Sequence, residues 1–434
     1  MKNNTESNAI TQRLDLLRAA YSTFHKDKAA LLCLWLLQLD EVQMIDAFVQ
    51  YENSEVGITP DFFLTFSSPF LNAKSYGQHL LAEVHQYFGK NGELLREAAL
   101  PDDIKIPQNA ETPFAVFQPL SEFARKAQPL LYVVAYLKPS EVSDFAQWEQ
   151  WIADALQQGL APQVRLMLAV PEQYYPFYAL RKAYKSQVKN LVPDLNMPDA
   201  LRQLASTGNL QDPAVQFRLL FLEMGQAAGA KDFERLNTAA EKALALTQEQ
   251  GWDQMEFTVR TAYGAHLQPH KHLQKAALDE YVKGRQIADR MVQQGHPLGG
   301  QIFLQSRLFY GAGLLNAGQY PEAAQEYEAA AAKIAGDEQQ RFQYMETCRL
   351  AGQSHMLAGN HEKAWSYYLN ALDAAELLDA EQRYNTLLLY VAAALIRLIP
   401  KANQERKETE IRDRIARLIG PDWESQMKNQ KISA

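Results

Sequence analysis

The stretch "GAGLLNAGQYPEAAQEYEAAAAKI", residues 311–334, recurs in altered form as "GQSHMLAGNHEKAWSYYLNALDAA", residues 352–375. The two stretches align at an offset of 41 residues. The alignment rests on four matched pairs, which are Gly318 with Gly359, Ala323 with Ala364, Tyr327 with Tyr368 and Ala330 with Ala371. A repeat of this length predicts a chain built from stacked structural units.

Each matched position has a packing reason. Gly318 lies where a helix is expected to stop, because a residue without a Cβ readily adopts the left-handed turn that ends a helix. Ala323 allows a second helix to approach closely, and Tyr327, four residues later, shares its face of that helix. The repeat unit is therefore predicted to be a helical hairpin, which buries its apolar face only by stacking on neighbours.

These hairpins resemble the tetratricopeptide repeat. That family has a small residue before the turn, an aromatic residue such as Tyr320 just after it, and an Ala in the second helix. The usual period of the family is about 34 residues, so an offset of 41 implies longer helices. The resemblance implies a solenoid whose first helices line a groove that binds a protein or peptide partner.

Weaker copies precede the clear pair, and a cap is expected to follow it. Residues 226–246 contain a turn at Gly229, and residues 266–288 place Tyr281 in the second helix. The segments 384–399 and 404–419 are predicted to close the array. We therefore assign residues 215–400 to about four repeats and residues 401–434 to a capping helix and tail.

The texture of the sequence differs before residue 210, where short β-rich runs alternate with helical stretches and prolines. We place a linker at 205–214, where Asp212 is expected to cap a helix that begins at Pro213. Residues 1–28 are predicted to form an N-terminal helix. Residues 29–204 are predicted to form an α/β domain with a small, mostly parallel sheet of three or four strands.

Strands are expected at 61–66, 130–137 and 163–170. The run "AALLCLWLL" within residues 29–39 fits either a buried strand or the start of a helix, since its periodicity does not separate the two. Helices are predicted at 11–25, 39–48, 74–89, 116–126 and 141–156, and through Tyr178 and Tyr184. Residues 90–112 are polar and contain prolines, which predicts a loop.

The layout of the N-terminal half, followed by helical repeats, resembles that of signal-transduction NTPases of the STAND type. A working nucleotide site needs a GxxxxGK[ST] loop, and this chain has none. The strand that ends near residue 137 is followed by Lys138 and Pro139 instead of magnesium-binding acids. We therefore expect a degenerate domain without a P-loop, without catalytic residues and without a nucleotide cofactor.

Composition excludes several other classes of protein. The formal net charge of −8 disfavours a broad grip on nucleic acid or anionic lipid. The longest apolar run, residues 29–39, is too short for a bilayer, which takes about 20 residues, and the N-terminus has no signal-peptide pattern. The two cysteines, Cys33 and Cys348, suit a reducing compartment. These features predict a cytoplasmic protein with no membrane insertion.

No metal site is expected. His266, His270 and His272 lie close together, but Pro269 interrupts any helix that would align them, so this segment is interpreted as a loop between helices.

The function predicted from the sequence is that of a non-enzymatic adaptor, scaffold or client-specific chaperone in a bacterial-type multiprotein system. The alternative is a regulatory switch that senses a small ligand or nucleotide through the α/β domain. A homo-oligomer is also compatible with the sequence. The candidate partner-binding residues on the first helices of the clear repeats are Arg307, Tyr310, Asn316, Arg349, Gln353 and His355. Trp148 and Trp151 are added because one of them is expected to be an exposed anchor.

Overall fold

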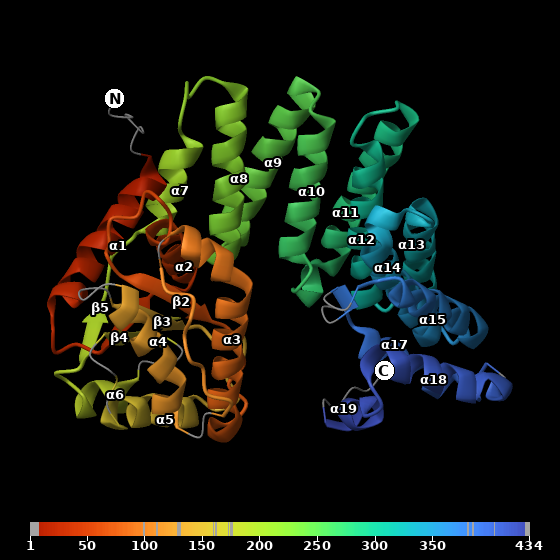
Figure 1. Ribbon diagram of the computed structural model, residues 1–434. Coiled ribbons are helices and arrows are strands. Elements are labelled where there is room, and N and C mark those ends of the chain that lie inside the picture. The colour runs from red at the N-terminus through yellow and green to blue at the C-terminus, as the bar shows by residue number, and fades with distance from the viewer. Residues whose placement is uncertain are drawn as a thin grey trace. The chain divides into compact units, whose positions relative to one another are not determined.

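The computed structural model describes residues 8–98, 100–109, 112–127, 132–158, 160, 163–171, 173, 177–379, 382–383, 386–402 and 404–429. The chain divides into two compact units, Met1–Leu204 and Ala205–Ala434. The first unit contains a sheet and helices, and the second is built from helices throughout its described residues (Figure 1). This order is the predicted fold class, an α/β domain followed by a helical solenoid.

The sheet of the first unit has five strands in the described residues, and every neighbouring pair is parallel. The strands are β1 (Leu32–Leu37), β2 (Phe62–Phe66), β3 (Val133–Leu137), β4 (Val164–Pro171) and β5 (Val188–Leu191). Their order across the sheet is β2-β3-β4-β1-β5. The run within residues 29–39 is thus a strand, and all six of its residues are buried because both faces of the sheet are covered.

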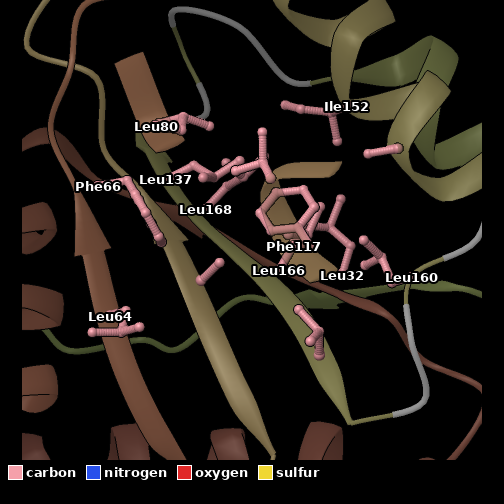
Figure 2. Packing of buried hydrophobic residues seen from close by; sticks show 14 of the residues in the cluster. Leu32, Leu64, Phe66, Leu80, Phe117, Leu137, Ile152, Leu160, Leu166 and Leu168 are labelled. Atoms are coloured by element: carbon pink, nitrogen blue, oxygen red, sulfur yellow. The ribbon is translucent and has the colours of Figure 1, made fainter. Parts of the chain in front are cut away.

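Successive strand residues point to opposite faces, and each face has its own core. One face packs on helices α3 (Ala73–Glu97), α4 (Pro113–Ala127) and α5 (Phe145–Gln158). Figure 2 shows Leu32 and Leu166 of this face beside Phe117 of α4. The other face packs on α1 (Ala9–Lys26) and α2 (Val42–Glu52). The domain is therefore a three-layer sandwich.

The structure corrects three expectations in this unit. The sheet has five strands in the described residues, where three or four were expected. The helix expected through Tyr178 and Tyr184 is the short α6 (Tyr178–Ala183), and the edge strand β5 follows it. Helix α3 continues to Glu97, so the predicted loop over 90–112 begins inside a helix. Residues 130–131 of the strand predicted at 130–137 lie outside the described residues. The last helix of the unit is α7 (Met197–Ala205).

The described part of the second unit contains four helical hairpins. They are α8 (Pro213–Gly229) with α9 (Phe233–Gln250), α10 (Asp253–Leu267) with α11 (Gln274–Gln293), α12 (Gly299–Asn316) with α13 (Tyr320–Ile334), and α14 (Arg341–Leu357) with α15 (His361–Glu376). As expected, Asp212 caps α8, its Oδ1 accepting a hydrogen bond from the Ala214 N–H at 2.8 Å. Helices α17 (Leu388–Leu398), α18 (Glu408–Ile419) and α19 (Trp423–Asn429) follow the last hairpin.

The repeat glycines have the conformation that their position predicts. Gly318 has a φ of +75° and Gly359 a φ of +79°, in the left-handed region. The matched alanines and tyrosines of the second helices are all buried. Among the described residues, no helix has the length and apolar character needed to span a bilayer.

Candidate partner-binding surface

Three first helices of the array are anchored by a glycine that faces a tyrosine of the second helix. The pairs are Gly264 with Tyr281, Gly311 with Tyr327, and Gly352 with Tyr368. A Cβ added at these glycines would lie 2.7 Å, 2.9 Å and 3.0 Å, respectively, from the nearest ring carbon. The glycines therefore set how closely the two helices of each hairpin approach, and they fix a common register for comparing α10, α12 and α14.

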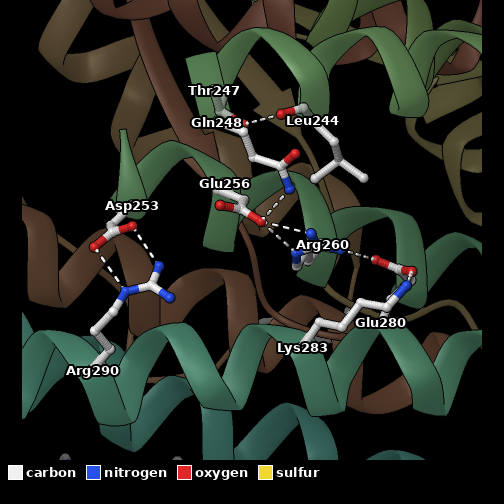
Figure 3. Close-up of polar contacts among 9 residues, drawn as sticks. All are labelled: Leu244, Thr247, Gln248, Asp253, Glu256, Arg260, Glu280, Lys283 and Arg290. Carbon is white, nitrogen blue, oxygen red and sulfur yellow. Dashed lines mark hydrogen bonds and ion pairs between the residues drawn. The ribbon is translucent and has the colours of Figure 1, made fainter. Parts of the chain in front are cut away.

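In two of these hairpins, an arginine four residues before the glycine pairs with a glutamate one residue before the tyrosine. Arg260 Nη1 lies 2.8 Å from Glu280 Oε2, as Figure 3 shows. At the equivalent positions, Arg307 Nη1 lies 2.8 Å from Glu326 Oε2. Asp289 also binds Arg307 at 2.8 Å. These nearly buried charges hold helices together, because an unpaired charge there would be costly.

The third anchored hairpin departs from this pattern. Cys348 and Tyr367 occupy the positions of the paired arginine and glutamate. Arg349, one residue further along, is bound by Glu346 at 2.7 Å. His355 occupies the position that Leu267 and Leu314 fill in the other hairpins.

His355 is buried at 4% exposure, and its Nε2 lies 2.7 Å from Glu328 Oε1 on α13. Lys363 Nζ, on α15, lies 3.1 Å from the same oxygen. Burial acts to raise the pKa of Glu328, but hydrogen bonds from His355 and Lys363 lower it below its usual value of 4.5. This contact therefore joins three helices through side-chain hydrogen bonds to Glu328.

Replacing Glu328 by Gln is expected to lower the melting temperature at pH 7. Because the pKa of Glu328 is depressed by folding, its stabilising effect is present above the unfolded pKa and is lost as the pH falls through the folded value. The difference between the variant and the unmodified chain should thus shrink below about pH 4.5. Melting curves from pH 7 to pH 3 test this, with exposed Glu322→Gln on the same helix as control. Parallel curves over the whole range would contradict it.

Several predicted partner-binding residues are engaged inside the array. Arg307, Arg349 and His355 are committed to the contacts above, which corrects their assignment to an open binding face. Tyr310 is half-buried, with the Arg285 guanidinium 5.4 Å from its ring centre.

Trp148 and Trp151 are both buried, at 3% and 4% exposure, in the core between α5 and the sheet. The expectation that one of them is an exposed anchor is therefore wrong. Trp148 packs on Phe177, with ring centres 5.5 Å apart, and Trp151 packs on Tyr76, with ring centres 5.0 Å apart.

The remaining two candidates lie on a different face of the first helices. Asn316 is exposed, and Gln353 is half-buried and accepts a hydrogen bond from Arg349 at 3.3 Å. Relative to the anchoring glycine, they stand five residues and one residue further along. The residues ten, six and two positions before the glycine lie on the same helix face, because all of these positions have similar angles around the helix axis.

We call this face the first-helix stripe. Its members are Gln254, Thr258, Ala262 and Ala265 on α10, Gln301, Gln305, Phe309, Ala312 and Asn316 on α12, and Phe342, Glu346, Leu350, Gln353 and Leu357 on α14. All are exposed or half-buried. Glu346 is the one charged member, and Arg349 and the Leu387 N–H bind it. Phe309, Phe342 and Leu357 are 42%, 38% and 46% exposed.

Apart from Glu346, whose charge is paired with Arg349, the stripe is therefore an uncharged surface with exposed aromatic and aliphatic groups. Glutamine and asparagine side chains both donate and accept hydrogen bonds, and exposed Phe side chains are typical contacts at protein interfaces. Extending the glycine register back along each first helix would have identified these residues from the sequence. The repeat segments that begin at Gly311 and Gly352 contain only the end of each first helix, so most of the stripe lies before them.

The carboxyl edge of the sheet is the other place where a ligand site is expected. In an open parallel sheet that site lies where adjacent strands connect to opposite faces. Here β1 leads to α2 on one face and adjacent β4 leads to α6 on the other. Residues 172 and 174–176, after β4, lie outside the described residues.

Carboxylates of the chain bind the loop amides at this edge. Buried Glu41 accepts hydrogen bonds from the Gln38 N–H at 2.9 Å and from the Leu195 N–H at 3.1 Å. Glu83 accepts from the N–H groups of Ser67 and Ser68 at 2.9 Å and 2.8 Å. Free backbone N–H groups in such loops are what hold a phosphate in nucleotide-binding domains. After β1 and β2, side-chain carboxylates occupy that role.

A cation follows β3. Lys138 Nζ lies 2.6 Å from Asp46 Oδ2 on α2, and Tyr136 donates to the other oxygen of Asp46 at 3.3 Å. Burial, with the nearby Asp46 charge, raises the pKa of Tyr136 far above its usual value. The acid at this edge is therefore neutralised by a lysine and comes from a helix, whereas a magnesium-binding acid is expected at the strand end.

The comparisons with known proteins are sparse. No family model and no curated protein matches this sequence. Among solved structures, a signal transduction ATPase with numerous domains (STAND) from Pyrococcus horikoshii, which has a tetratricopeptide repeat sensor, is similar at 9% identity and a TM-score of 0.33. The likeness covers 97% of this chain and 94% of that chain. At that TM-score it carries no argument, and the fold class rests on the sheet and the hairpins themselves.

Proposed function

We propose that this protein is a non-enzymatic interaction module, an adaptor, scaffold or client-specific chaperone, that binds a partner protein on the first-helix stripe. The observation that carries the proposal is the contrast within one array. Arg260 and Arg307 of the first helices form ion pairs between helices. The stripe presents mostly uncharged polar groups and the exposed side chains of Phe309 and Phe342. Such a surface suits contact with a protein segment.

The carboxyl edge of the α/β domain supports the non-enzymatic part of the proposal. Glu41 and Glu83 accept hydrogen bonds from the loop N–H groups, and Lys138 forms an ion pair with Asp46. A nucleotide phosphate would have to displace these carboxylates and would be repelled by them. The sensing of a nucleotide by this domain is therefore the less favoured alternative.

Two measurements test the proposed function. Thermal-shift assays with ATP, ADP and GTP should show no change in melting temperature, because a ligand that binds only the folded state must raise it. A clear nucleotide-dependent rise would support the regulatory-switch alternative.

The second measurement is site-specific photocrosslinking in the native host. A photoreactive phenylalanine analogue at Phe309 should yield a discrete crosslinked protein. The same analogue at Leu94, which is 62% exposed on α3, should not yield that product. Identical products from both positions would contradict binding on the stripe.

A further inference from the structure

A groove of about 470 Å³ opens where helices α12 and α14 begin, beside the end of α13. Its lining residues are Gly300, Gln301, Leu304, Gln305, Lys333, Ile334, Gln340 and Gln343. Leu304 and Ile334 are each 3% exposed and form an apolar floor. Gln301 and Gln305 belong to the first-helix stripe, so the groove is a recessed part of that surface.

The groove is lined by carboxamides that the protein itself leaves unused. Among the described residues, the side chains of Gln301, Gln305 and Gln343 have no hydrogen-bond partner, whereas Gln340 donates to Asp337 at 2.7 Å. A primary carboxamide offers two N–H donors and a carbonyl acceptor. A peptide group also offers both an N–H and a C=O, so three free carboxamides match the main chain of a bound segment.

Charge narrows the kind of segment that fits. Lys333 is the one charged residue that lines the groove, and it lies in the last turn of α13, where helix carbonyls partly offset its charge. A basic side chain of a partner buried here would find no carboxylate among the lining residues and would face the positive charge of Lys333, which is unfavourable. Exposed Phe342 adjoins Gln343 in sequence, and Phe309 stands one turn beyond Gln305, so both offer apolar contact at the margin.

A second groove on the same array gives the contrast. It measures about 480 Å³ and is lined by residues of α9, α10 and α11, among which are Glu241, Asp279, Glu280 and Lys283. Five of its eleven lining residues are charged, and Glu280 forms ion pairs with Arg260 and Lys283. The groove between α12 and α14, which has one charged lining residue, therefore differs from it.

We propose that this groove binds an extended segment of a partner protein that carries no basic side chain. The main-chain N–H and C=O groups of the segment pair with Gln301, Gln305 and Gln343, and its apolar side chains contact the floor and the two phenylalanines. The inference rests on the proposed function, because it names the chemistry of the partner segment that the first-helix stripe receives.

The test uses random dodecapeptides displayed on phage, selected against the immobilised full-length chain. Enriched peptides are synthesised with a fluorophore, and their binding is measured by anisotropy. Changing Gln305 to Glu keeps the side-chain shape but replaces donors with a negative charge. We expect Gln305→Glu to weaken binding at least about tenfold, which corresponds to about 1.4 kcal/mol. Gln325→Glu, an exposed position on α13 outside the groove lining, should stay within about twofold.

The outcomes separate this inference from the function on which it rests. Enriched peptides without basic residues at their centre that lose binding with Gln305→Glu support the groove. Peptides that share a positive charge, or that bind the Gln305→Glu variant unchanged, overturn it. If such peptides lose binding with Thr258→Arg, on the stripe of α10, the proposed function stands and only the groove fails. Absence of any enrichment over an unrelated helical protein contradicts both.

Discussion

Replacing Arg260 by Met is expected to destabilise the helical array by about 3–5 kcal/mol, the cost typical of breaking a buried ion pair on one side. Arg260 binds Glu256 at 2.6 Å and Glu280 at 2.8 Å, and all three side chains are about one-tenth exposed (Figure 3). Methionine fills similar space, but the carboxylates of Glu256 and Glu280 lose the positive charge with which they pair. Urea unfolding of the full chain, combined with amide hydrogen exchange over α10 and α11, measures the loss.

Arg290→Met is the matched control. Arg290 joins the same two helices through Asp253 at 2.6 Å, but these side chains are 46% and 29% exposed. Exposed ion pairs contribute about 1 kcal/mol or less, so this variant should change stability little. If Arg260→Met were no more destabilising than Arg290→Met, the buried pair would not hold the hairpin as argued. Replacing Glu256 and Glu280 as well by apolar residues should recover part of the loss.

Replacing Tyr327 by Ala is expected to lower the free energy of unfolding by about 3–5 kcal/mol, as for other large buried aromatic side chains. Tyr327 is 1% exposed and lies against Gly311 of the facing helix. The variant removes the aromatic ring that lies against Gly311 of α12. Hydrogen exchange of α12 and α13 should accelerate more than that of α8 and α9, which the same readout reports as an internal control.

The glycine facing Tyr327 gives a sharper check on that contact. In the unmodified chain, Gly311→Ala should destabilise the array, because the new Cβ would lie 2.9 Å from the ring. In the Tyr327→Ala background the ring is gone, and Gly311→Ala should then stabilise by up to about 1 kcal/mol through helix propensity. An unchanged sign in the two backgrounds would refute the steric role of Gly311.

The elements of the fold could largely be predicted because their signals are local. The turn glycines and the buried alanines and tyrosines of the second helices recur at a fixed offset. Strand β5 was missed because it is four residues long and carries Lys189 and Asn190 between its buried ends, so neither alternation nor an apolar run announces it. Helix α3 extends beyond the predicted end at residue 89, because residues 90–97, although polar, keep the helical spacing of the residues before them.

The candidate site was harder to predict because it depends on pairing between helices. Arg307 resembles a surface cation in the sequence, and only Glu326 on the facing helix α13 shows that it is paired. His355 is polar, yet its position in the repeat is a core position. The stripe itself was within reach, since the glycine that marks each first helix sets its faces once the alignment runs backwards from it.

The hairpins differ in their ion pairs, and this difference affects whether each helix packs on its correct partner during folding. Repeats of similar shape can misassemble during folding, because the second helix of one hairpin can pack in the position of the second helix of another. If α15 packed where α13 belongs, Arg307 would meet Tyr367 in place of Glu326 and would keep only Asp289 as its carboxylate partner. The ion pairs thus disfavour packing of a first helix against the wrong second helix. The Gly–Tyr contact occurs in every anchored hairpin, so it does not distinguish the correct second helix from a wrong one.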